Sequence, residues 1–117
     1  MTVYDDFMRG IACLKERRLD EAIRHLERAR DREPRKASIR EALGRARFAA
    51  GDFPLAAQEF EAALACDPTN DYAHFGLGLS LIRSGKRTLG VGHLKLARAL
   101  NPSNEDYVAY MKRYEDD

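Results

Sequence analysis

The chain has 117 residues, of which 44% are hydrophobic and 33% charged, and its formal net charge is +1. This length is sufficient for one modest core, and a net charge so close to zero gives no argument for nucleic acid or a membrane surface as partner. No stretch approaches the roughly 18 consecutive apolar residues of a membrane span, so no membrane insertion is expected. The first residues show no basic segment followed by an apolar run, so we expect no signal peptide. The two cysteines fit no metal or redox spacing, and these features together predict a cytoplasmic protein.

One pattern recurs along nearly the whole chain at a period of 34 residues. Three positions of the period hold the same residue type each time. They are Gly10, Gly44 and Gly78; Ala29, Ala63 and Ala97; and Pro34, Pro68 and Pro102. A fixed period of this length is typical of a stack of one structural unit, in which each unit buries its surface against its neighbours. The predicted units span residues 3–36, 37–70 and 71–104.

The first unit predicts a helix over about 2–16, a short turn, and a second helix that opens at Asp20 and is ended by Pro34. Apolar residues of the first helix follow one another at steps of three and four, as on one face of a helix. Asp6 lies on this helix, and because the first unit has no preceding neighbour we expect it to face water.

The second unit predicts a helix over about 37–50, a stop at Gly51, and a following helix with Pro54 in its first turn and Phe60 in its middle. The third unit predicts helices over about 71–83 and 88–100. The last of these contains Gly90 and Gly92, which each cost about 1 kcal/mol relative to alanine, so we expect it to be the weakest helix.

A seventh helix follows within residues 105–117, which we interpret as a C-terminal capping helix and an acidic tail. Ser103 and Asp106 have the spacing of a capping box at its start. Three tyrosines at steps of three and four, Tyr107, Tyr110 and Tyr114, form an aromatic stripe along it.

The recurring residues resemble the tetratricopeptide repeat (TPR) family, whose unit is a 34-residue helix–turn–helix. Small residues at one further position and large apolar residues at another fit the same pattern: Ala22, Ala56 and Gly90, and Leu26, Phe60 and Leu94. The resemblance implies an all-α superhelix, a TPR solenoid of about seven antiparallel helices. It also implies that the first helix of each unit lines a concave groove that binds a peptide or a partner's helix. Arg40 and Arg47 stand where the family has aromatic residues, and the sequence offers no account of them.

On the family's register, ten residues would form the binding surface. They are Tyr4, Phe7, Ile11, Glu41, Arg45, Phe48, Tyr72, Phe75, Leu79 and Ile82. The helix over 71–83 points to the same surface, because it is apolar nearly all round and packing between units explains only part of its apolar residues. The alternative is that the seventh helix, or a curled neighbouring unit, covers this stripe. Glu41 and Arg45, four residues apart, are either an ordinary surface pair or a polar pair that fixes the register of a bound segment.

Catalysis and metal binding have no support in the sequence. The three histidines lie in different units without a second ligand at metal spacing, and no nucleophile with a neighbouring base can be placed on one helix face, so we expect no enzyme, no metal and no cofactor. The basic residues of the third unit lack the aromatic or glycine interleaving of a nucleic-acid site, so no nucleic acid is expected. Some relatives grip a C-terminal carboxylate with basic and asparagine side chains; the matching positions here are Phe7, Ile11, Ala42, Tyr72 and Gly76, so an acidic C-terminal tail is not the expected ligand.

The sequence therefore predicts a protein–protein interaction module, an adaptor or a chaperone-like protein, whose partner is a protein or peptide with an apolar segment. The alternative is a homo-oligomeric scaffold component, such as a homodimer, that associates through the groove or through the tyrosine stripe. A third interpretation is that the three units are a part of a longer repeat array.

Overall fold

The computed structural model describes residues 1–115, which contain seven helices and no strand. The helices are α1 (Val3–Lys15), α2 (Leu19–Arg32), α3 (Ala37–Ala49), α4 (Phe53–Cys66), α5 (Asp71–Arg83), α6 (Arg87–Leu100) and α7 (Glu105–Glu115). The all-α class predicted from the sequence is therefore confirmed. The end of the predicted acidic tail, Asp116 and Asp117, lies outside the described residues.

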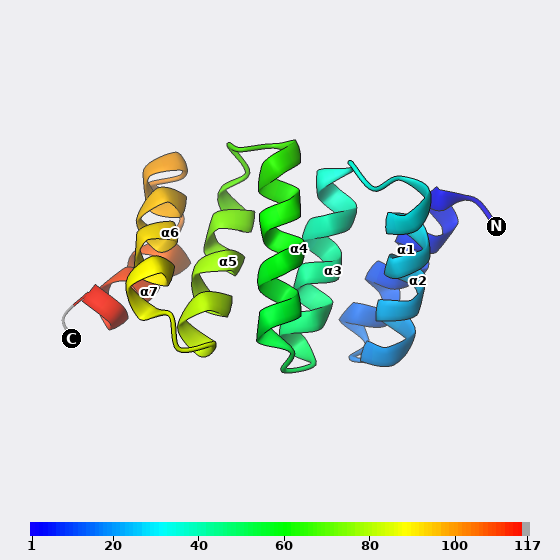
Figure 1. Cartoon of the computed structure of the whole chain (residues 1–117), viewed down its shortest axis with the longest axis horizontal. Helices are drawn as coiled ribbons and strands as arrows, with labels where there is room; N and C mark the ends of the chain where they lie inside the picture. The colour runs from blue at the N-terminus through cyan, green and yellow to red at the C-terminus, as the bar shows by residue number, and fades with distance from the viewer. Residues whose placement is uncertain (116–117) are drawn as a thin grey trace.

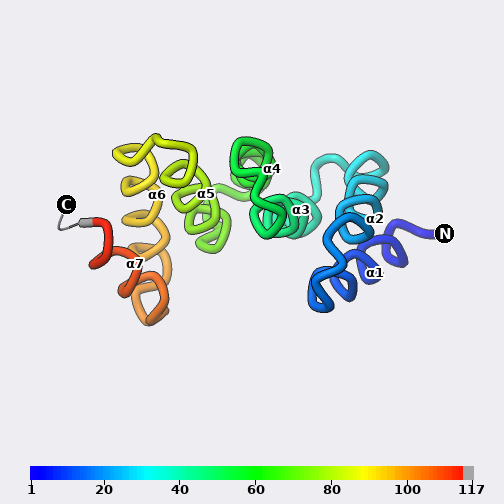
Figure 2. Tube along the Cα trace, turned by 90° about the horizontal axis from the view of Figure 1, so that it is seen from below, coloured from blue at the N-terminus to red at the C-terminus, as the bar shows by residue number. Residues whose placement is uncertain are grey.

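The helices follow one another as a row of antiparallel hairpins, so neighbours in sequence are neighbours in space (Figure 1). The molecule is elongated, with extents of 47 × 24 × 22 Å, and α1 and α7 lie at opposite ends of the row. The row is arched rather than straight: seen from below, α1 and α7 both bend to the same side, away from α4 (Figure 2). The first helices of successive pairs also touch, since α3 contacts both α1 and α5.

Close helix crossings explain the recurring glycines and large apolar residues. A Cβ atom added to Gly10 would lie 2.6 Å from the Cγ atom of Leu26, and one added to Gly44 would lie 2.9 Å from the ring of Phe60. Leu26 and Phe60 are buried in the two apolar core clusters. Each first helix therefore approaches its second helix so closely that only hydrogen fits between backbone and side chain.

The helix α6 is continuous through both of its glycines. Gly90 lies at the crossing of α5 and α6, where an added Cβ atom would lie 2.6 Å from the carbonyl oxygen of Gly78, whereas Gly92 has open space around it. The presence of Gly90 is thus a packing requirement, and the low stability expected for α6 stays a prediction.

Helix starts are capped by side chains in several units. Thr2 and Asp5 form a capping box at the start of α1, and Asn70 accepts the N–H of Ala73 at the start of α5. The capping box predicted from Ser103 and Asp106 is wrong. The oxygen of Asn104, 34 residues after Asn70, caps α7 by accepting the N–H groups of Asp106 and Tyr107. Because α7 begins at Glu105, Asp106 is one residue too early to complete a box with Ser103.

A polar pair joins the two helices of every repeat at the same place. In each pair a residue of the first helix meets a residue 19 positions later in the second helix. The pairs are Asp6 Oδ1 with His25 Nδ1 (3.1 Å), Arg40 Nη1 with Glu59 Oε2 (3.0 Å), and His74 Nδ1 with His93 Nδ1 (3.1 Å). Burial, and then the neighbouring His74, lower the pKa of His93 below its ordinary value.

These pairs correct one expectation and supply an account that the sequence lacked. Asp6, expected to face water, is 3% exposed, because α2 covers it with the side chains of His25 and Arg28. Arg40 replaces an aromatic residue because it binds Glu59. Arg47 likewise reaches across to α2, where its Nη2 atom lies 2.6 Å from Oε2 of Glu27. In the second repeat, ion pairs therefore stand where aromatic packing was expected.

The buried carboxylate of Glu59 also connects the first two repeats. Its Oε1 atom accepts from Arg30 of α2 at 2.9 Å and its Oε2 atom from Arg40 of α3 at 3.0 Å. Glu59 itself lies on α4 and is 7% exposed. One carboxylate thus joins helices from both sides of the repeat boundary, and each of its oxygens accepts a hydrogen bond from a cation.

Candidate functional site

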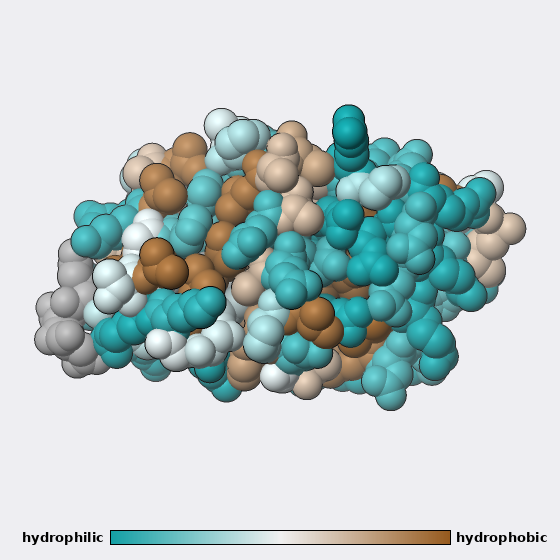
Figure 3. Space-filling view, viewed as in Figure 1, coloured by the Kyte–Doolittle hydropathy of each residue, from teal (hydrophilic) through white to brown (hydrophobic). Residues whose placement is uncertain are grey.

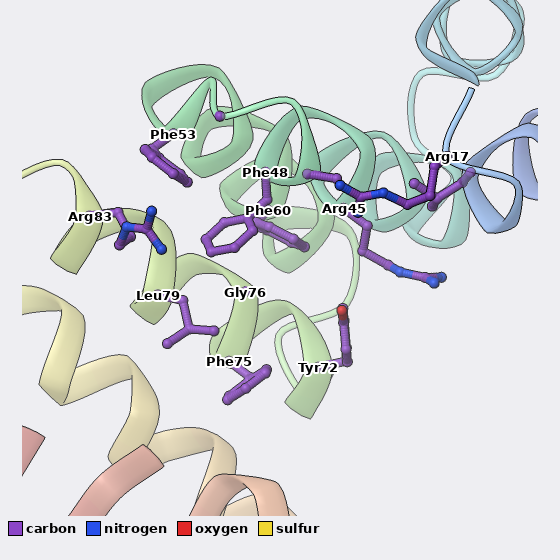
Figure 4. A pocket seen from close by; sticks show the side chains of 13 residues that line it. Arg17, Arg45, Phe48, Phe53, Phe60, Tyr72, Phe75, Gly76, Leu79 and Arg83 are labelled. Atoms are coloured by element: carbon purple, nitrogen blue, oxygen red, sulfur yellow. The ribbon is translucent and has the colours of Figure 1, made fainter. Parts of the chain in front are cut away.

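An open cavity of about 530 Å³ lies where α3 and α5 face each other (Figure 4). It is closed at one side by the turn between α1 and α2 and at another by the start of α4. The lining consists of apolar residues, glycines and arginines: Leu14, Arg17, Arg45, Phe48, Ala49, Gly51, Phe53, Phe60, Tyr72, Phe75, Gly76, Leu79 and Arg83. It contains no carboxylate, histidine, cysteine or hydroxyl group other than that of Tyr72.

Five aromatic rings line the cavity: Phe48, Phe53, Phe60, Tyr72 and Phe75. Phe60 lies at its bottom, against the backbone of Gly76, where an added Cβ atom would overlap the ring. The rings of Phe48 and Phe53 meet edge to face with centroids 5.0 Å apart, and those of Tyr72 and Phe75 are 6.0 Å apart. Such tilted arrangements are the favoured ones for aromatic pairs, so the rings hold one another in place.

Two of the arginines lie over these rings. The guanidinium carbon of Arg83 is 4.5 Å from the ring centroid of Phe53, and that of Arg45 is 5.8 Å from the ring centroid of Tyr72. Burial raises the pKa of Tyr72 above its ordinary value. The cations are held by attraction to aromatic faces, at the edge of an apolar surface.

The structure brings five of the ten predicted binding residues together in this cavity: Arg45, Phe48, Tyr72, Phe75 and Leu79. Two others, Tyr4 and Phe7, lie at a separate hollow of about 360 Å³ between α1 and the start of α3. The remaining three line neither. Ile11 packs against the core of the first repeats, Glu41 accepts a hydrogen bond from Asn70 at 2.9 Å, and Ile82 stands against Gly90 of α6.

The comparisons with known proteins agree with this architecture. Residues 7–71, more than half of the chain, match the family model of the tetratricopeptide repeat. The chain belongs to this family. A comparison with curated protein sequences finds no significant match.

Several solved TPR structures have the same fold. The TPR domain of Arabidopsis OM64 is 18% identical with a TM-score of 0.94, and the match covers 97% of this chain and 94% of that one. The second TPR domain of human RPAP3, solved in complex with the HSP70 peptide SGPTIEEVD, is 16% identical with a TM-score of 0.88, covering 97% and 98%. The Yersinia enterocolitica secretion chaperone SycD, solved with a peptide of the translocator YopD, is 15% identical with a TM-score of 0.83, covering 97% and 86%. At these identities the likeness shows the fold alone.

The C-terminal helix of this TPR protein covers one flank of the predicted apolar stripe. The rings of Tyr107 and Tyr110 lie with centroids 4.9 and 5.3 Å from that of Phe75, and the hydroxyl of Tyr107 donates to Asp71 at 2.8 Å. Burial and the carboxylate of Asp71 raise the pKa of Tyr107. The seventh helix therefore covers Phe75 from one side, as in the alternative considered from the sequence, while the other side lines the cavity. The tyrosine stripe is engaged within its own chain.

Eight of the thirteen lining residues were not among the predicted binding residues, and three of these eight have large side chains on the turns and helix ends around the cavity: Arg17, Phe53 and Arg83. Arg83 was recognised only as one of the basic residues of the third unit. Arg17 occupies the turn position that holds Gly51 and Gly85 in the other repeats, and all three have a positive φ, of 62°, 82° and 87°. That exchange of glycine for arginine at a repeat-related position is the signal that could have indicated Arg17.

The residues that line this cavity offer the chemistry of binding. The described part of the chain contains no group of three or more histidine, cysteine or carboxylate side chains that could hold a metal ion. None of its helices is long and apolar enough to cross a membrane. A cavity lined by aromatic rings and guanidinium groups can take up apolar groups and anions.

Proposed function

We propose that this TPR protein is an interaction module that binds an apolar segment of a partner protein in the cavity between α3 and α5. The observation that carries the proposal is the cavity itself: aromatic and leucine side chains that face an open volume of about 530 Å³ instead of closing the core. That volume is within the range of about 300–1,000 Å³ that is usual for ligand pockets. Exposed aromatic residues on a rigid helical scaffold are typical of peptide-recognition grooves.

Two of the similar structures support the proposal by what they were solved with. The RPAP3 domain holds an HSP70 peptide and SycD holds a peptide of its translocator. The arch of the row agrees with the proposal as well, because it turns one side of the helix stack into a concave surface (Figure 2). The role follows from binding: as adaptor or chaperone, the protein would shield an apolar segment of its partner from water.

The test uses Leu79, which lines the cavity and is half-buried. Peptides are selected from a random displayed library on the wild-type protein, and their affinities are measured by calorimetry. The Leu79→Gln variant should bind them at least tenfold more weakly, because a buried amide replaces apolar contact. The matched control is Leu89→Gln on α6, a leucine that is 62% exposed and outside the cavity, which should bind as the wild type does. Equal affinity of Leu79→Gln and the wild type would contradict the assignment of the cavity.

Self-association remains the second candidate, through a different surface from the one first considered. Apolar side chains gather over the half of the molecule that holds α4 to α6, whereas the half around α1 and α2 is mostly hydrophilic (Figure 3). On α6, Leu89, Leu96 and Leu100 are 62%, 47% and 44% exposed. Sedimentation across a range of concentrations separates the two candidates, because a protein that stays monomeric at high micromolar concentration has no such dimer.

A further inference from the structure

Three arginines from three different repeats converge on the cavity. Arg17 comes from the turn between α1 and α2, Arg45 from α3, and Arg83 from the last turn of α5. The chain as a whole is balanced, with 20 basic and 19 acidic residues, yet the lining of the cavity contains no acidic residue at all. The cavity therefore carries a local positive charge that nothing in its own lining neutralises.

Of these three arginines, Arg45 is half-buried, whereas Arg17 and Arg83 are exposed. They differ from the arginines that carboxylates hold in the fold. Arg30, Arg40 and Arg47 each lie within 3.0 Å of a glutamate oxygen. Among the residues that the structure describes, neither Arg45 nor Arg83 forms an ion pair, and both lie over aromatic rings. A guanidinium group held by an aromatic face keeps N–H donors at its edge, where they can bind a carboxylate in a bidentate manner.

The arginines stand at two ends of the apolar surface. In Figure 4, Arg83 lies at one end beside Phe53, and Arg17 and Arg45 lie together at the other end. The rings of Phe48 and Phe60 lie between the two ends. The surface thus has an apolar centre with a cationic group on either side, and its complement is an apolar side chain with an anionic group on either side.

We propose that the segment bound in this cavity is acidic: one large apolar side chain flanked on both sides by aspartate or glutamate. This rests on the proposed function and specifies its partner. Because cations stand at both ends, the segment passes through the cavity as an internal stretch of the partner, and its side-chain carboxylates supply the negative charge. Recognition does not depend on a terminal carboxylate.

The experiment measures the fluorescence anisotropy of short labelled peptides whose C-terminus is amidated, at low and at physiological salt. The first peptide has two glutamates on each side of one phenylalanine, the second has glutamine in place of every glutamate, and the third keeps the glutamates but has alanine in place of phenylalanine. We expect the first peptide to bind at least tenfold more tightly than either of the others. Its affinity should fall as salt is added, because the arginines are accessible to solvent.

Variants of the protein assign the charge effect to the cavity. Arg45→Gln and Arg83→Gln should each weaken binding of the glutamate peptide about tenfold and leave binding of the glutamine peptide unchanged. The matched control is Arg24→Gln, an exposed arginine on α2 outside the cavity, which should change neither affinity. Circular dichroism of each variant verifies that the helices are retained.

The outcomes separate this inference from the proposed function. If the glutamine peptide binds as tightly as the glutamate peptide and Leu79→Gln weakens both, the cavity binds apolar segments and the charge inference is overturned. If the glutamate peptide binds only with a free C-terminal carboxylate, the internal mode is overturned. If neither these peptides nor any library peptide binds, the proposed function itself fails.

Discussion

Arg17 has a backbone conformation that its side chain does not favour. Its φ of 62° lies in the left-handed region, where the repeat-related residues are Gly51 and Gly85. A residue with a Cβ atom loses about 1 kcal/mol in this region relative to glycine. We therefore predict that Arg17→Gly raises the free energy of unfolding by about 1 kcal/mol, measured by urea denaturation.

The matched control at this position is Arg17→Ala. It removes the same side chain but keeps the Cβ atom and hence the strain, so its stability should equal that of the wild type. A gain of stability in Arg17→Ala as large as in Arg17→Gly would show that the side chain, and not the backbone, causes the effect.

Single residues are also where the sequence was least informative. Asp6 was expected in water because its helix has no preceding neighbour, but the side chains that cover it come from α2, 19 and 22 residues later in the chain. The sequence could not explain why Arg40 and Arg47 replace aromatic residues, because their partners Glu59 and Glu27 lie on other helices. A periodic pattern indicates which face a residue occupies, and it does not indicate which polar group stands opposite.

The two glycines of α6 play opposite parts within one helix. Gly90 is at the crossing with α5, where a Cβ atom would meet a backbone carbonyl, and Gly92 has open space around it. We predict that Gly90→Ala lowers the free energy of unfolding by about 2 kcal/mol through overpacking. Gly92→Ala should raise it by about 1 kcal/mol through helix propensity. Each is the control for the other, measured by thermal or urea unfolding.

Two results would contradict this account. A stabilising Gly90→Ala would mean that α5 and α6 can separate slightly without loss. A neutral Gly92→Ala would mean that the intrinsic preference of α6 does not limit the stability of the molecule.

Elements were predicted well because they depend on local signals. The period of 34 residues, the prolines and the turn glycines placed every helix pair within a few residues of its observed bounds. The start of α7 is the exception. Ser103 matched a capping pattern, but Asn104 stands in the place that Asn70 has one repeat earlier and caps the helix instead. For the capping residue of α7, the repeat-related position of Asn70 was therefore a better predictor than the short capping-box motif.

At the scale of the whole molecule, Glu59 joins the first repeat to the second. Removing the charge of Glu59 leaves Arg40 of α3 without a carboxylate partner and removes one of the ion pairs of Arg30 of α2. We predict that Glu59→Gln lowers the free energy of unfolding by about 3 kcal/mol, as for other broken buried ion pairs. Stability in a stack depends on the contacts between neighbours, so amide hydrogen exchange should accelerate most in α1 and α2.

Glu61→Gln is the control for this variant, because Glu61 lies on the same helix and is exposed. It should change the free energy of unfolding by less than about 0.5 kcal/mol. Uniformly faster exchange across all helices in Glu59→Gln would show that the molecule opens as one unit and that the bridge has no special role at the repeat boundary.

The candidate cavity was predictable only in part at this scale. The family register placed Phe48, Tyr72 and Leu79 on one surface, and the structure joins them. The family register could not place Arg17 or Arg83 at the cavity, because their distance from it depends on how far successive repeats rotate against one another. The register also could not show that Ile82 lies against α6, because this contact follows from the close helix crossing at Gly90.

The 19-residue pairs have a consequence for how the chain assembles. Three units of the same shape could in principle join the first helix of one hairpin to the second helix of another. Such an exchange would set Asp6 against Glu59, two carboxylates in one buried place, or Arg40 against His25, two basic groups without an anion. Mispaired hairpins are a characteristic failure of repeat proteins, and here the charges of the first two repeats disfavour an exchange between them. Differences among the repeats at this one position therefore favour the correct connectivity while the chain folds.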